Sequence, residues 1–241
     1  MDKDVGVKVR IIFLSVLLLG ASFVLSFEKV KTLSLAAGGI SKLEIDCGAG
    51  FLKVTGDETL QGIEVKAEIV VSGKEKDKAQ EYIDKNVELY LEAKSRRAVL
   101  DSKFKEKFSL FNFGRREINL TVTVPGGIDL DIDDGSGKIS VTDLKGRVKI
   151  DDGSGDIYLE NIEGDVAIDD GSGKIDALNI NGNVDLDDGS GSISLVNIGQ
   201  NVIVSDGSGY IDIDGVGGDV IIREEGSGGV NIHNVKGKII K

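Results

Sequence analysis

The sequence predicts an all-β protein: a single-stranded parallel β-solenoid with 18-residue coils, preceded by an irregular β-rich cap with one short helix. Two observations lead to this fold class. The phrase Asp-Asp-Gly-Ser-Gly begins at Asp133 and returns at Asp151, Asp169 and Asp187, each time after 18 residues. The chain also contains 33 glycines but only one proline and no tryptophan. A fixed period of this length is typical of coils that bury their apolar side chains only by stacking, and regularly spaced glycines between β-branched residues indicate short strands joined by tight turns.

The regular coils are expected over residues 128–241. Their apolar side chains form five columns, which begin at Leu130, Ile132, Ile139, Val141 and Leu144 and recur with the same period. Within each half of a coil the spacing is two, so these side chains point inward and the charged ones between them point outward. The intervals exclude a left-handed hexapeptide helix, which needs an aliphatic residue every six positions. They also exclude a calcium-binding nonapeptide roll, whose aspartate lies two positions after the glycine.

Residues 1–26 are expected to be a signal peptide or an N-terminal membrane anchor. Charged residues near the start are followed by an uncharged apolar run from Ile11 to Phe27. This run is slightly short for a membrane span and slightly long for a signal-peptide core. Both alternatives place the rest of the chain outside the cytoplasm, in the periplasm, at the cell surface or anchored to a membrane and facing outward.

Residues 27–127 are expected to form the β-rich N-terminal part of the solenoid and its cap. The stretch Leu43–Val54 matches a later coil with Cys47 in place of the second aspartate, and we expect it to start the stack, with Cys47 as a small side chain at a turn. Strands are expected over residues 63–71, 87–93 and, around a long loop, 97–124. Between them, a capping box of Ser72 and Glu75 and the helical spacing of Ala79, Tyr82, Ile83 and Val87 predict a helix near 74–86 that covers one end of the stack.

These features resemble those of a known family. The hydrophobic N-terminus, the β-segment with a helical insertion, the strand that ends in Val124-Pro125-Gly126 and the train of Gly-Ser-Gly turns are similar to the bacterial family of unknown function named putative adhesins with β-strand repeats. The resemblance covers residues 40–240. It implies a β-solenoid on an exported or envelope protein, and it implies no catalytic residues.

The aspartates of the repeat are the first candidate site. Stacking places them in two neighbouring columns about 4.8 Å apart from coil to coil. The second aspartate of each pair has the position of an Asx-type turn residue, which accepts backbone N–H groups of its own turn. The alternative is a site for Ca²⁺, which prefers hard oxygen ligands. The candidate metal ligands are Asp133, Asp134, Asp151, Asp152, Asp169, Asp170, Asp187, Asp188 and Asp206. A further column of Asp143, Asn161, Asn179, Asn197 and Asn234, broken by Gly215, is expected to be a structural ladder.

The loop from Lys103 to Arg116 is the second candidate site. It interleaves phenylalanines with basic residues, which suits contact with a membrane interface or an acidic partner. The alternative is a loop whose phenylalanines pack on the cap while its lysines remain in water. The candidate contact residues are Phe104, Phe108, Phe111, Phe113, Lys103, Lys105 and Lys107.

Charge and composition bound the function. Residues 128–241 carry 23 acidic and 9 basic side chains, which argues against nucleic acid as a partner and leaves an envelope component, a glycan or another protein. No cofactor other than calcium is expected. The identical coils offer no distinct catalytic site, and the single histidine, His233, falls at an outward position. We therefore expect a non-catalytic exported envelope or surface protein whose solenoid is a rigid acidic binding face or spacer. The alternatives are a self-assembling envelope scaffold and, less favoured, a carbohydrate-active enzyme on a β-helix.

Overall fold

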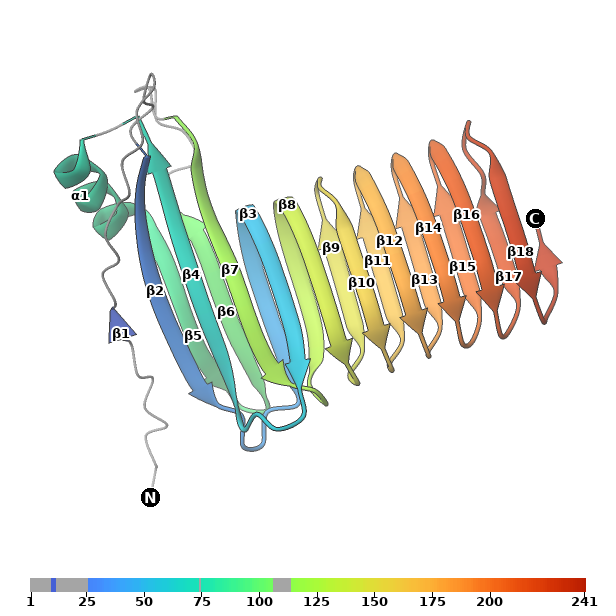
Figure 1. Cartoon of the computed structure of the whole chain (residues 1–241), viewed down its shortest axis with the longest axis horizontal. Helices are drawn as coiled ribbons and strands as arrows, with labels where there is room; N and C mark the ends of the chain where they lie inside the picture. Colours follow the sequence, from blue (N-terminus) through green and yellow to red (C-terminus); the bar gives the residue numbers. More distant parts are fainter. Residues whose placement is uncertain (1–9, 12–25, 74, 106–113) are drawn as a thin grey trace.

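The computed structural model describes residues 10–11, 26–73, 75–105 and 114–241. The strands belong to one hydrogen-bonded system that runs from an N-terminal cap to a regular stack of coils (Figure 1). The expected parallel β-solenoid is confirmed. Every pairing among β8 and the later strands is parallel. The register is offset by 18 residues, as in Ile157 with Ile175, and by 19 residues in the last coil, as in Ile211 with Val230. No helix among the described residues is both long enough and apolar enough to cross a membrane.

Each regular coil contributes one strand to each of two parallel sheets. The first sheet contains the first half of β8 followed by β9, β11, β13, β15, β17 and β19, and the second contains the second half of β8 followed by β10, β12, β14, β16 and β18. The strands are β8 Asp129–Leu144, β9 Val148–Asp152, β10 Ile157–Ile162, β11 Val166–Asp170, β12 Gly173–Ile180, β13 Val184–Asp188, β14 Gly191–Ile198, β15 Val202–Asp206, β16 Gly209–Val216, β17 Val220–Glu224, β18 Val230–Val235 and β19 Ile239–Ile240.

The core follows the predicted columns. Their members from Leu130 to Ile222 are all buried, and strands such as β9 alternate between buried and exposed side chains. In the last coil, Val230, Ile232 and Val235 are only partly buried, because fewer strands pack over them. The column prediction is therefore confirmed, and the interior is a continuous aliphatic layer between the two sheets.

The strand β3 Lys42–Asp57 forms the coil that the sequence matched to the later repeat. It pairs with β8 in the expected register, with Cys47 beside Asp134 and Ala49 beside Ser136. The expectation that this coil starts the stack is wrong, however. On its other side, β3 pairs in parallel with β6 Arg97–Phe104 and with β7 Arg116–Pro125, so these two strands form a further coil-like layer. Along β3, the pairing passes from β6 to β7 at the position where β8 has its Gly-Ser-Gly corner.

Antiparallel strands complete the cap. The strand β2 Ser26–Ala36 pairs with β4 Gly62–Ser72, which also pairs with β7, and β5 Val87–Lys94 pairs with β6. The short β1, Arg10–Ile11, pairs with β2. The switch from parallel to antiparallel pairing ends the coil repeat at this side of the stack.

The helix α1 spans Lys76–Asn86 and packs against β2, β4 and β5, at the cap end of the molecule (Figure 1). Its buried residues are Ala79, Tyr82 and Ile83, as the helical spacing predicted. The capping box is wrong, because Glu75 is the N-cap and makes no side-chain capping bond among the described residues. Ser72 instead ends β4, where its Oγ donates to the Arg115 carbonyl oxygen at 3.3 Å.

Candidate functional site

The second aspartate of each repeat lies inside the corner of its coil. The backbone N–H of Ser154 donates to Oδ1 of Asp152 at 3.2 Å, and the same bond joins Ser172 to Asp170, Ser190 to Asp188 and Ser208 to Asp206. These four carboxyl groups are 3% exposed or less. The Asx-type turn is confirmed, and these aspartates hold the corner in shape.

The other carboxyl oxygen of each of these aspartates has no hydrogen-bond partner. Oδ2 of Asp152, Asp170, Asp188 and Asp206 is buried and unpaired within the described residues, and both oxygens of Asp134 are likewise buried. Burial raises the pKa of Asp134 to about 6, of Asp152 to about 7 and of Asp188 to about 6, and it also raises the pKa of Asp170 and Asp206. A buried carboxyl group without a cation beside it is favoured in its neutral form.

Cys47 lies at the N-terminal end of this buried column, beside Asp134. Burial and the neighbouring carboxylate raise the pKa of the Cys47 thiol, which opposes formation of the reactive thiolate. The interpretation of Cys47 as a turn residue is confirmed.

The first aspartates of the repeats form the second, exposed column. Asp133, Asp151, Asp169 and Asp187 are in direct register on β8, β9, β11 and β13, with their side chains in solvent. Within the part of the chain that the structure describes, no group of three or more His, Cys, Asp or Glu side chains is gathered as a metal site. Calcium binding by the two columns stays a prediction.

The basic and aromatic loop is only partly described. The ring of Phe104 stacks on Tyr82 of α1 with 6.3 Å between centroids, and the Arg116 guanidinium lies 5.9 Å from the centre of the Phe104 ring. Lys103 forms ion pairs with Asp101 at 2.7 Å and with Asp46 at 3.3 Å, whereas Lys105 is exposed. The remaining candidates, Lys107, Phe108, Phe111 and Phe113, lie outside the described residues. Phe104 and Lys103 are thus engaged with the cap.

A hollow of about 460 Å³ lies on the outer face of the first sheet, across β8, β9, β11 and β13. Its rim is formed by Lys42, Asp129, Asp131, Arg147, Lys149, Asp165, Asn183 and Asp185. Ala167 also lines it, at an exposed position between Lys149 and Asp185 on the neighbouring strands. Because Ala167 has the shortest side chain in this row, the surface is lower there than on either side. We call this hollow the charged groove.

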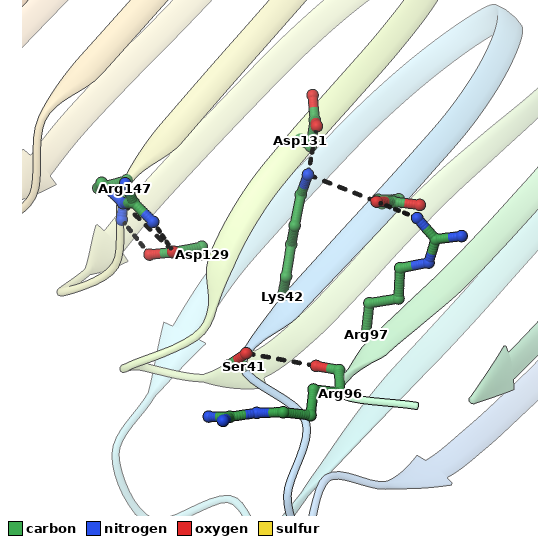
Figure 2. Close-up of polar contacts among 8 residues, drawn as sticks. Ser41, Lys42, Arg96, Arg97, Asp129, Asp131 and Arg147 are labelled. Atoms are coloured by element: carbon green, nitrogen blue, oxygen red, sulfur yellow. Dashed lines mark hydrogen bonds and ion pairs between the residues drawn. The ribbon is translucent and has the colours of Figure 1, made fainter. Parts of the chain in front are cut away.

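Ion pairs organise the cap end of the charged groove (Figure 2). The ammonium group of Lys42 on β3 binds Asp131 of β8 at 2.6 Å and Glu44 at 3.4 Å, and Arg97 of β6 binds Glu44 from the other side at 3.1 Å. The hydrogen bond to Asp131 raises the pKa of Lys42. Arg147 binds Asp129 through its guanidinium at 2.7 Å and through its backbone N–H at 2.9 Å. Lys149 makes no ion pair among the described residues, so its ammonium group remains available beside Ala167.

The backbone bond of Arg147 to Asp129 begins a ladder of side-chain to backbone hydrogen bonds that continues along one edge of the charged groove. Asn183 donates its backbone N–H to Oδ1 of Asp165 at 2.8 Å, and Asn201 repeats this bond to Asn183 at 3.2 Å. This backbone bond holds the pKa of Asp165 below its usual range. The ladder continues through Asp219 to Lys238.

Neither the charged groove nor the ladder along its edge was predicted from the sequence. The ladder could have been recognised, since residues 129, 147, 165, 183, 201 and 219 are polar and each precedes the first buried residue of a coil. No sequence pattern indicates the charged groove, because Lys42 and Asp131 are 89 residues apart and meet only through the pairing of β3 with β8. The predicted asparagine ladder is confirmed: Asn179 donates to Asn161, and Asn197 to Asn179, both at 3.1 Å.

His233 lies at an exposed position on β18, as expected. It stands away from the charged groove, whose lining contains neither histidine nor cysteine. The groove offers carboxylates, amides, a guanidinium and an ammonium group, which are hydrogen-bonding and ion-pairing groups suited to holding a polar ligand.

No family model and no curated protein matches the chain. Among solved structures, it is similar to a putative adhesin from Bacteroides fragilis (15% identity, TM-score 0.42), with 88% of this chain and 96% of that chain covered. It is also similar to a putative cell adhesion protein from Clostridium sporogenes (14%, 0.32), with 88% and 97% covered. A third is a putative lipid binding protein from Parabacteroides distasonis (13%, 0.35), with the same coverage.

Proposed function

We propose that this chain is a non-catalytic exported protein of the cell envelope or surface, whose solenoid presents a rigid binding face to a glycan. The observation that carries the proposal is the charged groove, in which fixed acidic and amide groups face an unpaired ammonium group across a low apolar floor at Ala167. Its volume of about 460 Å³ falls within the range of roughly 300–1,000 Å³ that is usual for ligand sites.

Among the described residues, only one cation of the charged groove makes no ion pair, so the groove suits a sugar that places a single carboxylate at Lys149, whereas its four carboxylates would repel a polyanion. Lys149 makes no ion pair among the described residues and would receive the carboxylate. Asp165, Asn183 and Asp185 would bind hydroxyl groups, which both donate and accept hydrogen bonds. The polar side chains along this edge recur from coil to coil, about 4.8 Å apart. A linear glycan can follow such a row, whereas a single small solute would use one step of it.

The uniformity of the coils supports a non-catalytic role. Four successive corners present the same aspartate pair, and the corner connections between regular strands are short, so no loop encloses a reaction centre along the described coils. Carboxylates that repeat identically hold no position distinct enough to divide the roles of acid and base.

Filling the hollow tests the proposed function. Ala167→Ile places an isoleucine in a row that already holds Ile203, so the variant should fold while its side chain occupies the floor of the groove. Binding is measured on an array of linear oligosaccharides with and without uronic acids. We expect the wild type to bind those that contain uronic acids, and the variant to bind them at least 10-fold more weakly. Lys149→Gln should weaken binding of the carboxylated sugars and leave binding of neutral sugars unchanged.

Ser194→Ile is the matched control, since it adds the same side chain to an outward position of β14 on the other sheet. Equal binding by Ala167→Ile and Ser194→Ile would refute the groove as the site. Cell fractionation of the full chain, with N-terminal sequencing of the product, tests export. Recovery in the cytoplasm with an intact N-terminus would refute that part of the proposal.

A further inference from the structure

Five buried carboxyl groups run in a row along one corner of the solenoid. Asp134, Asp152, Asp170, Asp188 and Asp206 are in direct register on successive coils, and their exposed fractions are 3%, 3%, 2%, 1% and 0%. Stacked strands place neighbouring members about 4.8 Å apart. We call this set the inner aspartate column. The charged groove does not use it, because these side chains point into the corner and away from that face.

In four of these five carboxyl groups only one oxygen has a hydrogen-bond partner among the described residues, and in Asp134 neither oxygen has one. In four coils Oδ1 accepts the serine N–H of its own turn, while Oδ2 is buried with no partner among the described residues. An ionised carboxylate is an acceptor at both oxygens, so burying one of them unpaired is costly. A neutral carboxylic acid carries a proton on that oxygen and avoids the cost of a buried charge.

The groups that face the column do not offset its charge. Next to Asp134 lie the Cys47 thiol and the outer Asp133. Asp170 is faced by Asp169 and Asp156, and Asp188 by Asp187. The remaining charged neighbours are the other members of the column. Among the described residues, therefore, no lysine, arginine or histidine is a leading influence on these five groups, although Lys149 acts on the adjacent Asp133.

We propose that the inner aspartate column is a proton-binding site of the folded solenoid, which takes up protons as the medium becomes mildly acidic and thereby tightens the stack of coils. The coil geometry makes the members interact, because adding a negative charge to one raises the cost of a charge on the next. The column therefore acts as one extended titrating unit along the axis, and not as five independent acids.

The direction of the effect follows from the folded and unfolded states. In the folded protein burial raises the pKa of Asp152 to about 7 and of Asp134 and Asp188 to about 6, whereas an unfolded aspartate has its ordinary value of 3.8. The folded state thus binds more protons between these values. The contribution to stability is fully present below pH 3.8 and is lost as the pH rises through 6 to 7. Acidic proteins whose aspartates are ion-paired behave in the opposite way.

Replacing three members of the column tests the proposal. In Asp152→Asn/Asp170→Asn/Asp188→Asn, each amide oxygen can still accept the serine N–H, and the side chain is neutral at every pH. The chain already stacks amides at this repeat, as in Asn179 on Asn161. We expect the wild type to melt at a higher temperature at pH 5 than at pH 8, and the variant to melt at pH 8 close to its own value at pH 5.

The control removes the same number of charges from the exposed column, as Asp151→Asn/Asp169→Asn/Asp187→Asn. This variant should keep the pH dependence of the wild type. If both triple variants lose it equally, general charge repulsion explains the effect and the proposal fails. Carboxyl ¹³C NMR of the wild type provides a test that needs no variant: several aspartates should titrate between pH 5.5 and 7.5, roughly two or more units above ordinary aspartates. Their titration only below pH 5 would overturn the proposal.

The competing explanation is that the inner aspartate column binds calcium, and it is tested by melting the protein with 1 mM calcium. If calcium raises the melting temperature of the wild type at pH 8, and Asp152→Asn/Asp170→Asn/Asp188→Asn abolishes that rise, the column binds a metal ion in place of protons. The expected result is no calcium effect that depends on these three residues.

Discussion

The two glycines of one Gly-Ser-Gly corner have different structural roles. Gly137 adopts a φ of +145°, and a methyl group on it would overlap the carbonyl oxygen of Gly50 on the preceding coil. Gly135, two residues earlier, has only Gly48 Cα near such a methyl group, at 3.8 Å. The repeat phrase identified both as the corner of the coil. It could not show which of them is needed for close approach between coils, because that depends on the neighbouring backbone.

Substitution of these two glycines should therefore give very different results. We expect Gly137→Ala to reduce the free energy of unfolding by roughly 3 kcal/mol or more, since both the overlap and the positive φ oppose it. Gly135→Ala should cost under about 1 kcal/mol, because it meets ordinary contacts. Urea unfolding of both variants measures the difference. Similar losses would mean that the corner relaxes freely.

At the scale of the element, the asparagine ladder shows how a local conformation and a side-chain bond combine. Asp143, Asn161, Asn179, Asn197 and Asn234 all have a φ between +54° and +60°, a region that asparagine tolerates better than most residues. Gly215 occupies the same position with a φ of +80°. The ladder stops there, and Asn234 binds Asp214 on the preceding coil in its place.

Gly215→Asn should extend the ladder. The new amide can donate to Asn197, and asparagine also loses less backbone entropy on folding than glycine. We expect a gain of about 0.5–1.5 kcal/mol in the free energy of unfolding, measured by urea denaturation. Gly215→Ala is the control, since it strains the positive φ without adding an amide and should destabilise the protein. A loss with Gly215→Asn as large as with Gly215→Ala would contradict the prediction.

The elements of the cap could be predicted only in part from the sequence. The amphipathic spacing of Ala79, Tyr82 and Ile83 identified α1, because a buried helical face depends on the segment itself. The capping box failed because Ser72 is held by β4 and by Arg115, which comes 43 residues later. The layer of β6 and β7 beyond β3 was missed for the same reason, as these strands contain no copy of the repeat phrase.

For the whole molecule, the repeat makes the length of the solenoid adjustable. Each regular strand has the same partners one coil before and one coil after it, so removal of one complete coil restores equivalent contacts. Most of the solenoid could thus be predicted from its columns. The charged groove could not, since it lies where irregular β3 meets the first regular coils and depends on Lys42 and Arg147, which have no equivalents in the other coils.

Deletion of residues 171–188 joins Asp170 to Gly189 and removes one coil. We expect this variant to fold, with a β-rich circular dichroism spectrum and a single cooperative melt. Deletion of only residues 171–179 exchanges the two sheets for every later strand, and we expect it to be insoluble or to lose the cooperative melt. Equal behaviour of the two deletions would show that the period does not govern packing.

The position of β3 between the cap and the regular coils has a consequence for how the chain is assembled. This strand is made before either neighbour, and it presents one pleated edge to β6 and β7 and the other to β8. Once the cap has occupied the first edge, only the second is free to template the chain that follows. The identical repeats would otherwise allow a coil to dock one period out of place. Because the coils add in one direction from β3, each coil has a single strand edge to pair with, in the order in which the chain is synthesised.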